Sequence, residues 1–347
     1  MSILEVKNLN LGFETESGFK QALYDVSFSL EKGEIHAIVG ESGCGKTISA
    51  MSILQLLPKT AKITGGEIYL GEQEKSEEKR GKRKKNNCTS QSLHPSPFTL
   101  HLYNLLKLSS KELENIRGSK IALIPQDPMT ALNPLYTIGN QLLEVIKKHQ
   151  GLNNKEAEQK AIEALEMVQI PSAKERLNTY PHEFSGGMKQ RAIIAMALAC
   201  NAQIIIADEP TTALDVTIQA QIMKLLDDIK KTTGTSILLI THDLALVEDC
   251  ADKISVMYSG RIVETAPVKD FFENTNHPYS KALLKSIPTQ KGEKLAIIEG
   301  QPPSIQQEIS GCKFHPRCQF AMPVCSEQVP ELKEISANHF SACWLNN

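Results

Sequence analysis

The sequence has few aromatic residues, little net charge and no long uninterrupted apolar run. Aromatic side chains make up 5% of its 347 residues, and the formal net charge is −2. A balance so close to neutral gives no reason to expect nucleic acid as the main partner. The longest apolar stretch, residues 192–207, contains Asn201 and Gln203, and it is shorter than the ~20 residues that span a bilayer. Residues 1–10 lack a basic head followed by an apolar run, so no signal peptide is expected.

Strand-like and helical patterns alternate along most of the chain. The expected strands are residues 3–6, 26–30, 34–39, 65–70, 203–207 and 236–240. The expected helices are residues 48–57, 155–168, 188–199 and 216–230. Such alternation predicts an α/β fold with a largely parallel sheet and helices on both faces. From about residue 268 the pattern becomes proline-rich and irregular, which suggests a separate appended module.

Residues 73–104 differ in composition from their surroundings. Lys79–Lys85 is almost entirely basic, and the stretch up to Pro97 is polar and rich in proline. This composition is typical of a solvated, disordered surface insertion. Contact with anionic lipid or nucleic acid is the alternative, although no aromatic residue is interspersed among the charges.

A glycine-rich segment fits the phosphate-loop pattern G-x-x-x-x-G-K-S/T in full. Its residues are Gly40, Glu41, Ser42, Gly43, Cys44, Gly45, Lys46 and Thr47. The glycines allow backbone N–H groups to surround a phosphate, and the helix that follows adds its positive end. Lys46 is expected to reach the β- and γ-phosphates, and the Thr47 hydroxyl to ligate Mg²⁺. With a strand pattern before it and a helical pattern after it, the segment predicts an Mg-ATP site.

Carboxylates follow the expected strand at residues 203–207. Asp208 at a strand end beside a phosphate loop suits Mg²⁺, usually through water. Glu209 is then placed to orient or deprotonate the attacking water. His242 follows another expected strand on the same edge, where a γ-phosphate contact is expected. An ordinary loop histidine is the alternative for His242.

A second candidate anion site precedes the helix expected at residues 188–199. Ser185, Gly186 and Gly187 offer a hydroxyl and free N–H groups at the N-terminus of this helix. Taken alone, such a segment is more often a helix cap and turn.

These motifs have the order and spacing found in the nucleotide-binding domain of ABC transporters, and the chain resembles that family. The matching segments are the Walker A loop at Gly40–Thr47, the Q-loop at Gln126, the signature at Ser185–Gly187, the Walker B end at Asp208 and Glu209, the D-loop at Ala213–Asp215 and the H-loop at His242. The resemblance implies ATP and Mg²⁺ as ligands. It implies catalytic roles for Glu209, His242 and Gln126, and Mg²⁺ ligation by Thr47, Asp208 and Gln126.

The resemblance also implies an architecture. It is a P-loop NTPase of ABC type with a mainly parallel central sheet, an antiparallel N-terminal β subdomain, a helical signature subdomain and a small Cys-rich C-terminal module. The nucleotide-binding domain would occupy residues 1–267 and the C-terminal region residues 268–347. Two such domains stack head to tail, so Ser185–Gly187 would act on ATP bound by the partner. Phe13 matches the aromatic residue that stacks on adenine; Phe19 is the second choice, and a core position is the alternative for both.

Three further segments resemble the ATP-binding subunits of oligopeptide/dipeptide permeases. They are residues 126–134, the variant signature at residues 184–188, and His277-Pro278-Tyr279. The implied function is an ATP-hydrolysing subunit of a peptide importer, peripheral at the cytoplasmic face of the inner or plasma membrane. Its implied partners are a second, distinct ATPase subunit, two transmembrane permeases and, indirectly, an extracytoplasmic solute-binding protein; nucleic acid is not among them. Importers of nickel or glutathione share this branch, and a soluble ABC ATPase of DNA repair or translation is the alternative from another class.

Four of the eight cysteines crowd near the C-terminus: Cys312, Cys318, Cys325 and Cys343. A cytosolic chain seldom uses such a cluster for disulfides, so a metal site is expected. The spacing resembles the tail of the dipeptide-type subunits, which is associated with a 4Fe–4S cluster. Four thiolates suit iron–sulfur or Zn²⁺, and the lack of paired C-x₂-C knuckles favours iron–sulfur. Redox regulation of the ATPase would be an additional function of such a cluster.

Overall fold

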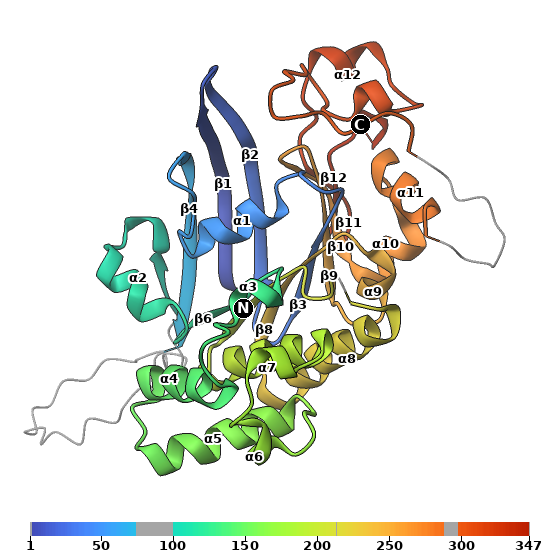
Figure 1. Cartoon of the computed structure of the whole chain (residues 1–347). Coiled ribbons are helices and arrows are strands. Elements are labelled where there is room, and N and C mark those ends of the chain that lie inside the picture. The colour runs from blue at the N-terminus through green and yellow to red at the C-terminus, as the bar shows by residue number, and fades with distance from the viewer. Residues whose placement is uncertain (1, 74–99, 213, 288–297, 347) are drawn as a thin grey trace, which may run out of the picture.

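The chain folds around two β-sheets, shown in the computed structural model in Figure 1. The structure describes residues 2–73, 100–212, 214–287 and 298–346. The smaller sheet has four antiparallel strands in the order β2-β1-β4-β5. These strands are β1 (Ser2–Thr15), β2 (Gly18–Glu31), β4 (Ala61–Gln73) and β5 (Leu100–Asn104). The antiparallel N-terminal β subdomain predicted from the family resemblance is thus present, and its strands are longer than the sequence pattern indicated.

The predicted insertion at residues 73–104 has a different C-terminal boundary in the structure. Residues 100–104 form β5, which pairs antiparallel with β4 from Tyr69 to Gln73. The prediction was wrong for this stretch because the strand is stabilised by a partner distant in sequence, not by a local pattern. The basic segment Lys79–Lys85 and Cys88 lie outside the described residues.

The larger sheet has eight strands in the order β11-β12-β10-β9-β3-β8-β7-β6. They are β3 (Ile35–Val39), β6 (Ile121–Ile124), β7 (Ile204–Asp208), β8 (Ser236–Thr241), β9 (Lys253–Tyr258), β10 (Arg261–Pro267), β11 (Lys333–Ser336) and β12 (His339–Ser341). Strands β6, β7, β8, β3 and β9 run parallel to one another, whereas β10, β12 and β11 are added antiparallel beyond β9. The sheet is therefore mixed, with the predicted parallel array in the centre and an antiparallel addition at one end.

Side chains of β3 alternate between two hydrophobic cores. Ile38 packs with the four-stranded sheet and with α1, whereas Ala37 and Val39 pack with the helices on the opposite face. This division follows from the period of two in a strand, which sends successive side chains to opposite faces. The helices are α1 (Lys46–Ile53), α2 (Ser110–Ile116), α3 (Pro128–Ala131), α4 (Ile138–Gln150), α5 (Asn154–Met167), α6 (Ala173–Arg176), α7 (Gly186–Ala199), α8 (Val216–Thr233), α9 (Leu244–Glu248), α10 (Val268–Asn274), α11 (Pro278–Lys285) and α12 (Pro323–Glu327).

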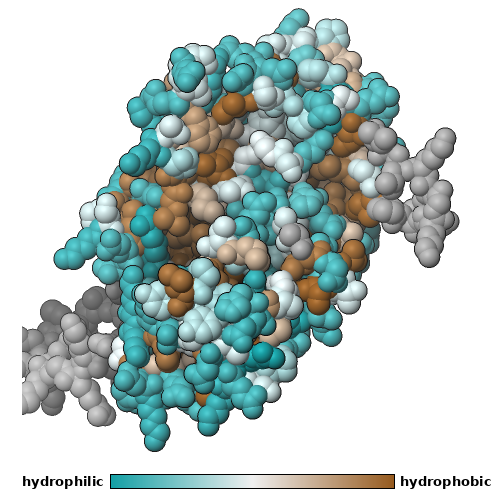
Figure 2. Space-filling model, in the orientation of Figure 1, coloured by the Kyte–Doolittle hydropathy of each residue, from teal (hydrophilic) through white to brown (hydrophobic). Residues whose placement is uncertain are grey.

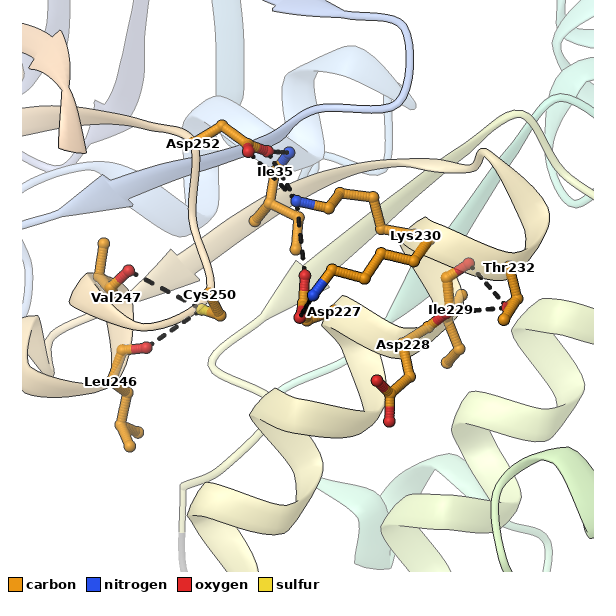
Figure 3. A network of polar contacts seen from close by, with 11 residues as sticks. Ile35, Asp227, Asp228, Ile229, Lys230, Thr232, Leu246, Val247, Cys250 and Asp252 are labelled. Carbon is orange, nitrogen blue, oxygen red and sulfur yellow. Dashed lines mark hydrogen bonds and ion pairs between the residues drawn. The ribbon is translucent and has the colours of Figure 1, made fainter. Parts of the chain in front are cut away.

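A polar network fixes the start of β3, the strand that leads into the phosphate loop (Figure 3). Asp252 accepts a hydrogen bond from the Ile35 N–H at 2.7 Å and pairs with Lys230 of α8 at 3.0 Å. Lys230 also lies 3.5 Å from Asp227, one turn earlier in α8. The carboxylate of Asp252 thereby ties β3, β9 and the C-terminal turn of α8 to one another.

The C-terminal region does not form the separate module that its irregular sequence suggested. Strand β12 pairs with β10, with Thr265 opposite Phe340, and β11 pairs with β12 at the sheet edge. Phe314 is buried in the same core as the helices on that face. The last strands are therefore part of the central sheet, which is a correction to the sequence-based expectation.

Surface polarity varies over the face shown in Figure 2. Hydrophilic residues predominate at the bottom of that view, where α5 and α6 lie in Figure 1, and hydrophobic residues gather at mid-height.

Among the described residues, no helix is both long enough and apolar enough to cross a membrane.

Candidate active site

The phosphate-loop residues connect β3 to α1 at one edge of the eight-stranded sheet. Lys46 is buried, and its Nζ donates to the carbonyl oxygens of Gly40 at 2.8 Å and Glu41 at 3.0 Å. These bonds curl the loop around its own lysine. The predicted context, a strand before the loop and a helix after it, is confirmed.

Two glycines of the loop hold positions that no other residue would fill without strain. Gly45 has a φ of 111°, in the left-handed region that favours glycine, and a Cβ there would press on the Leu23 side chain. A Cβ on Gly40 would overlap the Met257 carbonyl oxygen. The loop therefore depends on glycine both for its turn and for its close packing against β9.

Thr47 and Asp208 meet across the site. The Thr47 hydroxyl donates to Asp208 Oδ1 at 3.0 Å, and Asp208 is buried at the end of β7. Burial raises the pKa of Asp208, and the neighbouring Glu209 charge raises it further, while the Thr47 hydrogen bond lowers it. A hydroxyl and a desolvated carboxylate side by side are oxygen donors of the kind that Mg²⁺ prefers.

Glu209 lies at the centre of a cluster of polar side chains. Its Oε2 accepts hydrogen bonds from Gln126 Nε2 at 3.1 Å and from the Thr212 hydroxyl at 2.9 Å. Nδ1 of His242 lies 3.3 Å from the same oxygen. The structure thus brings Glu209, Gln126 and His242 together, as expected from the sequence, and adds Thr212.

A cavity of about 360 Å³ opens beside the phosphate loop and Glu209. Phe13, Gln21, Ala22 and Tyr24 of the smaller sheet line one side of it. Phe19 is 42% exposed and is not among the cavity-lining residues. Of the two aromatic residues considered for stacking on adenine, Phe13 is the one that faces the pocket.

The signature residues lie away from this cavity. Ser185 caps α7, where its hydroxyl accepts from the Met188 N–H at 3.3 Å, and both Ser185 and Gly186 are exposed. None of Ser185, Gly186 and Gly187 is among the residues that line the pocket. The N-terminus of α7 is therefore an exposed helix end that does not face the cavity beside the chain's own phosphate loop. Of the expected D-loop, Leu214 and Asp215 are described and Ala213 is not.

The C-terminal region contributes pocket residues that sequence reasoning missed. Pro303, Ser304, Ile305, Gln307 and Lys313 line the same cavity as the phosphate loop. No sequence pattern could have identified them, because they are distant from the loop in the chain and have no motif of their own. Thr212 lies three residues after Glu209, and its hydroxyl was the only feature of the sequence that could have marked it as a partner of that carboxylate.

The four C-terminal cysteines converge in space. Cys312, Cys318, Cys325 and Cys343 all line one small cavity, together with His315 and Trp344, and all four are free thiols. Burial, with contributions from the three neighbouring cysteines, raises the pKa of the Cys312 thiol to about 11. Nevertheless, no group of three or more His, Cys, Asp or Glu side chains in the described part of the chain has the arrangement of a metal site. The donor set suits a metal cluster, but the predicted iron–sulfur site is not supported by the geometry.

Two family models match the sequence. The model described as "ABC transporter" matches residues 23–212, and the one described as "Oligopeptide/dipeptide transporter, C-terminal region" matches residues 263–325. The first contains the phosphate loop, Gln126, the signature and Glu209. The second includes Pro303, Ser304, Ile305, Gln307 and Lys313, which line the cavity beside the phosphate loop.

Similar proteins match along almost their entire lengths. The probable peptide ABC transporter ATP-binding protein y4tR of Sinorhizobium fredii is 45% identical, over 99% of this chain and 95% of the relative. The dipeptide transport ATP-binding protein DppD of Bacillus subtilis is 44% identical over the same shares. A solved dimeric structure of the ATP-binding cassette MJ0796, in a post-hydrolysis state with ADP and Pi, superposes with a TM-score of 0.60 at 27% identity, covering 76% of this chain and 98% of that one. The chain belongs to the ATP-binding proteins of the ABC transporter family, in the group with the oligopeptide/dipeptide transporter C-terminal region.

Proposed function

We propose that this chain is the ATP-hydrolysing subunit of an ABC importer that takes up di- or oligopeptides. The observation that carries the proposal is the cluster of Gln126, Thr212 and His242 around the Glu209 carboxylate, beside a complete phosphate loop. The substrate class is supported by the names of the relatives, which are peptide and dipeptide transport proteins.

Binding of ATP would rely on the phosphate loop. Lys46 is held by two loop carbonyls, from which its ammonium can move to the β- and γ-phosphates. Mg²⁺ would be held by the Thr47 hydroxyl and the Asp208 carboxylate, with Gln126 as a further ligand, and would neutralise charge on the phosphates. Phe13 would stack on the adenine from the other side of the cavity.

Hydrolysis would depend on Glu209. A carboxylate whose position is fixed by two hydrogen-bond donors and a neighbouring imidazole is well placed to orient a water molecule and accept its proton. His242 is 53% exposed, so its ring is accessible to the terminal phosphate of a bound nucleotide. Gln126 would contact the γ-phosphate. The surface at residues 126–134 would transmit the conformational change that accompanies hydrolysis to a permease.

A second ATPase subunit would complete the site. The exposed N-terminus of α7, with Ser185 and its two glycines, would bind the γ-phosphate of ATP held by the partner. The remaining partners would be two transmembrane permeases and, through them, a solute-binding protein outside the membrane. The chain would thus be peripheral, at the cytoplasmic face of the membrane.

Uptake by cells tests the proposal. Deletion of the gene should abolish the uptake of labelled dipeptide. Expression of the wild-type chain in the deletion strain should restore this uptake, whereas expression of Lys46→Ala should not. Uptake of nickel or glutathione in place of peptide would assign the chain to another branch of importers. Co-purification with ribosomes or DNA rather than with membranes would contradict a transport role.

We also propose that the four C-terminal cysteines hold a 4Fe–4S cluster. The proposal is supported by the donor set, four free thiols that line one cavity in which no described residue is a carboxylate, and not by a preformed metal geometry. Protein purified without oxygen should contain about four iron atoms and four sulfides per chain by chemical analysis, and Cys325→Ser should lower both. A colourless protein without iron would contradict the proposal, and bound zinc would identify the alternative.

A further inference from the structure

Glu41, in the phosphate loop, is the residue at which the C-terminal region contacts that loop. Its N–H donates to the Tyr279 hydroxyl at 3.0 Å, and its carbonyl accepts from Lys46 Nζ at 3.0 Å. Its carboxylate is paired with Arg317, a residue 276 positions later in the chain. The backbone and the side chain of Glu41 are thus held from three directions.

Arg317 donates hydrogen bonds to this carboxylate from both of its terminal nitrogens. Nη1 donates to Glu41 Oε2 at 2.7 Å and Nη2 to Glu41 Oε1 at 3.0 Å. The Arg317 side chain is only 6% exposed, and that of Glu41 is 25% exposed. Such a bidentate pair has a defined geometry that a lysine cannot reproduce, and its burial limits screening by solvent and salt.

The same guanidinium also holds a wall of the nucleotide cavity. Its Nε donates to the Glu299 carbonyl at 3.0 Å and Nη2 to the Ile298 carbonyl at 3.4 Å. The chain continues from these residues to Pro303, Ile305 and Gln307, which line the cavity. Arg317 therefore fixes two parts of one pocket, the phosphate loop and the segment from residue 298 to residue 307.

We propose that Arg317 is a positioning residue of the nucleotide site, which holds the phosphate loop through Glu41 and makes nucleotide binding depend on the C-terminal region. The loop binds phosphate through several backbone N–H groups, so it binds best when their positions are fixed in advance. Without the pair, the loop would be less ordered before ATP binds. Part of the binding free energy would then be used to order the loop, so the affinity for ATP would fall. The inference rests on the proposed ATP-dependent function.

The test compares nucleotide affinity with stability in purified full-length variants. Binding of a fluorescent ATP analogue and the midpoint of thermal unfolding are measured for the wild type, Arg317→Ala, Arg317→Lys, Glu41→Gln and the double variant Glu41→Gln/Arg317→Ala. We expect Arg317→Ala and Glu41→Gln each to weaken binding about tenfold, within the range typical of coupling between sites. The double variant should lose no more than Arg317→Ala alone, because both changes remove the same Glu41–Arg317 pair. The affinity of Arg317→Lys should lie between those of the wild type and Arg317→Ala, because an ammonium keeps the positive charge but cannot form the bidentate pair.

Arg191→Ala provides the matched control. Arg191 is 9% exposed, close to the 6% of the Arg317 side chain, and it donates to the Val168 carbonyl at 2.7 Å and to Gln221 at 3.0 Å, but it does not line the cavity. Its loss should lower the unfolding temperature and leave nucleotide affinity within about twofold of the wild type, a far smaller change than a typical coupling.

The outcomes distinguish failure of the positioning role from failure of the proposed function. Unchanged affinity in Arg317→Ala and Glu41→Gln, or an equal loss in Arg191→Ala, would overturn the positioning role while leaving the ATPase intact. If Arg317→Ala does not fold, Glu41→Gln decides, because it is isosteric and leaves Arg317 in place. A wild-type chain that binds no ATP would instead contradict the proposed function itself.

Discussion

Glu209 adopts a backbone conformation that is rare for a residue with a side chain. Its φ is +45°, at the point where β7 ends, and its N–H donates to the Ile240 carbonyl at 2.8 Å. Left-handed non-glycine residues are uncommon, and they cluster at sites where geometry matters more than strain. Here the turn directs the carboxylate toward Gln126 and His242 instead of along the strand.

The role of Glu209 can be tested with an isosteric change. Glu209→Gln should bind ATP as well as the wild type but hydrolyse it about 10²–10⁴ times more slowly, the usual contribution of a general base. Phosphate release and binding of labelled ATP are measured on the same preparation. Turnover close to that of the wild type would show that another group activates the water.

Lys46 is predicted to be required for binding rather than for chemistry alone. Lys46→Ala removes the ammonium that is held at the Gly40 and Glu41 carbonyls and would otherwise contact the phosphates. ATP affinity, measured by equilibrium dialysis, should fall by at least about tenfold, which corresponds to about 1.4 kcal/mol. Unchanged affinity would contradict the assignment of the phosphate loop.

His36 should make stability depend on pH. Burial, with a contribution from the Lys253 charge, lowers the pKa of His36 from 6.5 to about 3. Between these values the unfolded chain binds more protons than the folded chain, so the free energy of unfolding falls as the pH decreases through this window. The loss approaches ~1.4 kcal/mol per pH unit, or about 2 kcal/mol between pH 7 and pH 5.

Urea unfolding at pH 7 and pH 5 measures this effect. His36→Gln keeps a polar side chain between its partners, the Ser29 carbonyl and the Ser255 hydroxyl, but it cannot titrate. The variant should therefore show a smaller difference between the two pH values. An identical difference in both proteins would assign the pH dependence to other groups.

At the scale of elements, β12 shows how the C-terminal segment is built into the central sheet. His339 is fully buried, with Nε2 at 2.8 Å from Glu264 of β10 and Nδ1 at 2.6 Å from Asp270 of α10. Glu264 is also fully buried, and it accepts the N–H groups of Asn276 and His277. One histidine thus links β12 to β10 and to α10.

Removal of His339 should destabilise the whole protein. His339→Ala leaves the buried Glu264 carboxylate without its side-chain partner, which typically costs about 3–5 kcal/mol. Lys269→Ala, which removes an exposed ion pair with Glu273, is the control and should change stability by less than about 0.5 kcal/mol. Equal effects of both changes in urea unfolding would indicate that β12 contributes little to the stability of the sheet.

Helices and strands with strong periodicity were predicted closely, and those stabilised by distant partners were not. The helix expected at residues 155–168 is α5 (Asn154–Met167), and the strand at residues 236–240 is β8 (Ser236–Thr241). The helix expected at residues 48–57 instead ends at Ile53, four residues earlier. Strands β5, β11 and β12 are short, and they exist because neighbouring strands supply their hydrogen bonds.

At the scale of the whole molecule, the phosphate loop and the signature segment lie apart within one chain. The phosphate loop and Glu209 line a cavity, whereas the exposed Ser185 at the start of α7 does not face it. This arrangement agrees with a pair of subunits stacked head to tail. An isolated chain should accordingly bind ATP better than it hydrolyses it.

Ser185 offers a test of this arrangement. Ser185→Ala should leave the ATP affinity of the isolated chain unchanged, because the residue lies outside its own pocket. In the assembled transporter the variant should hydrolyse ATP more slowly, by about tenfold or more, because one donor to the transferred phosphate is lost. A weaker affinity in the isolated chain would show that Ser185 acts within its own subunit.

The sequence by itself determined the phosphate loop, the Asp208–Glu209 pair at a strand end and the family, because the chemistry of phosphate binding requires particular residues at fixed spacing in short segments. It also determined the helices and strands whose periodicity is local. Only the tertiary structure decided that the last strands complete the central sheet, that residues 303–305 and Gln307 line the cavity beside the phosphate loop, and that Arg317 holds Glu41. These features depend on contacts between segments far apart in the chain, which have no local pattern and arise only when burial brings the segments together.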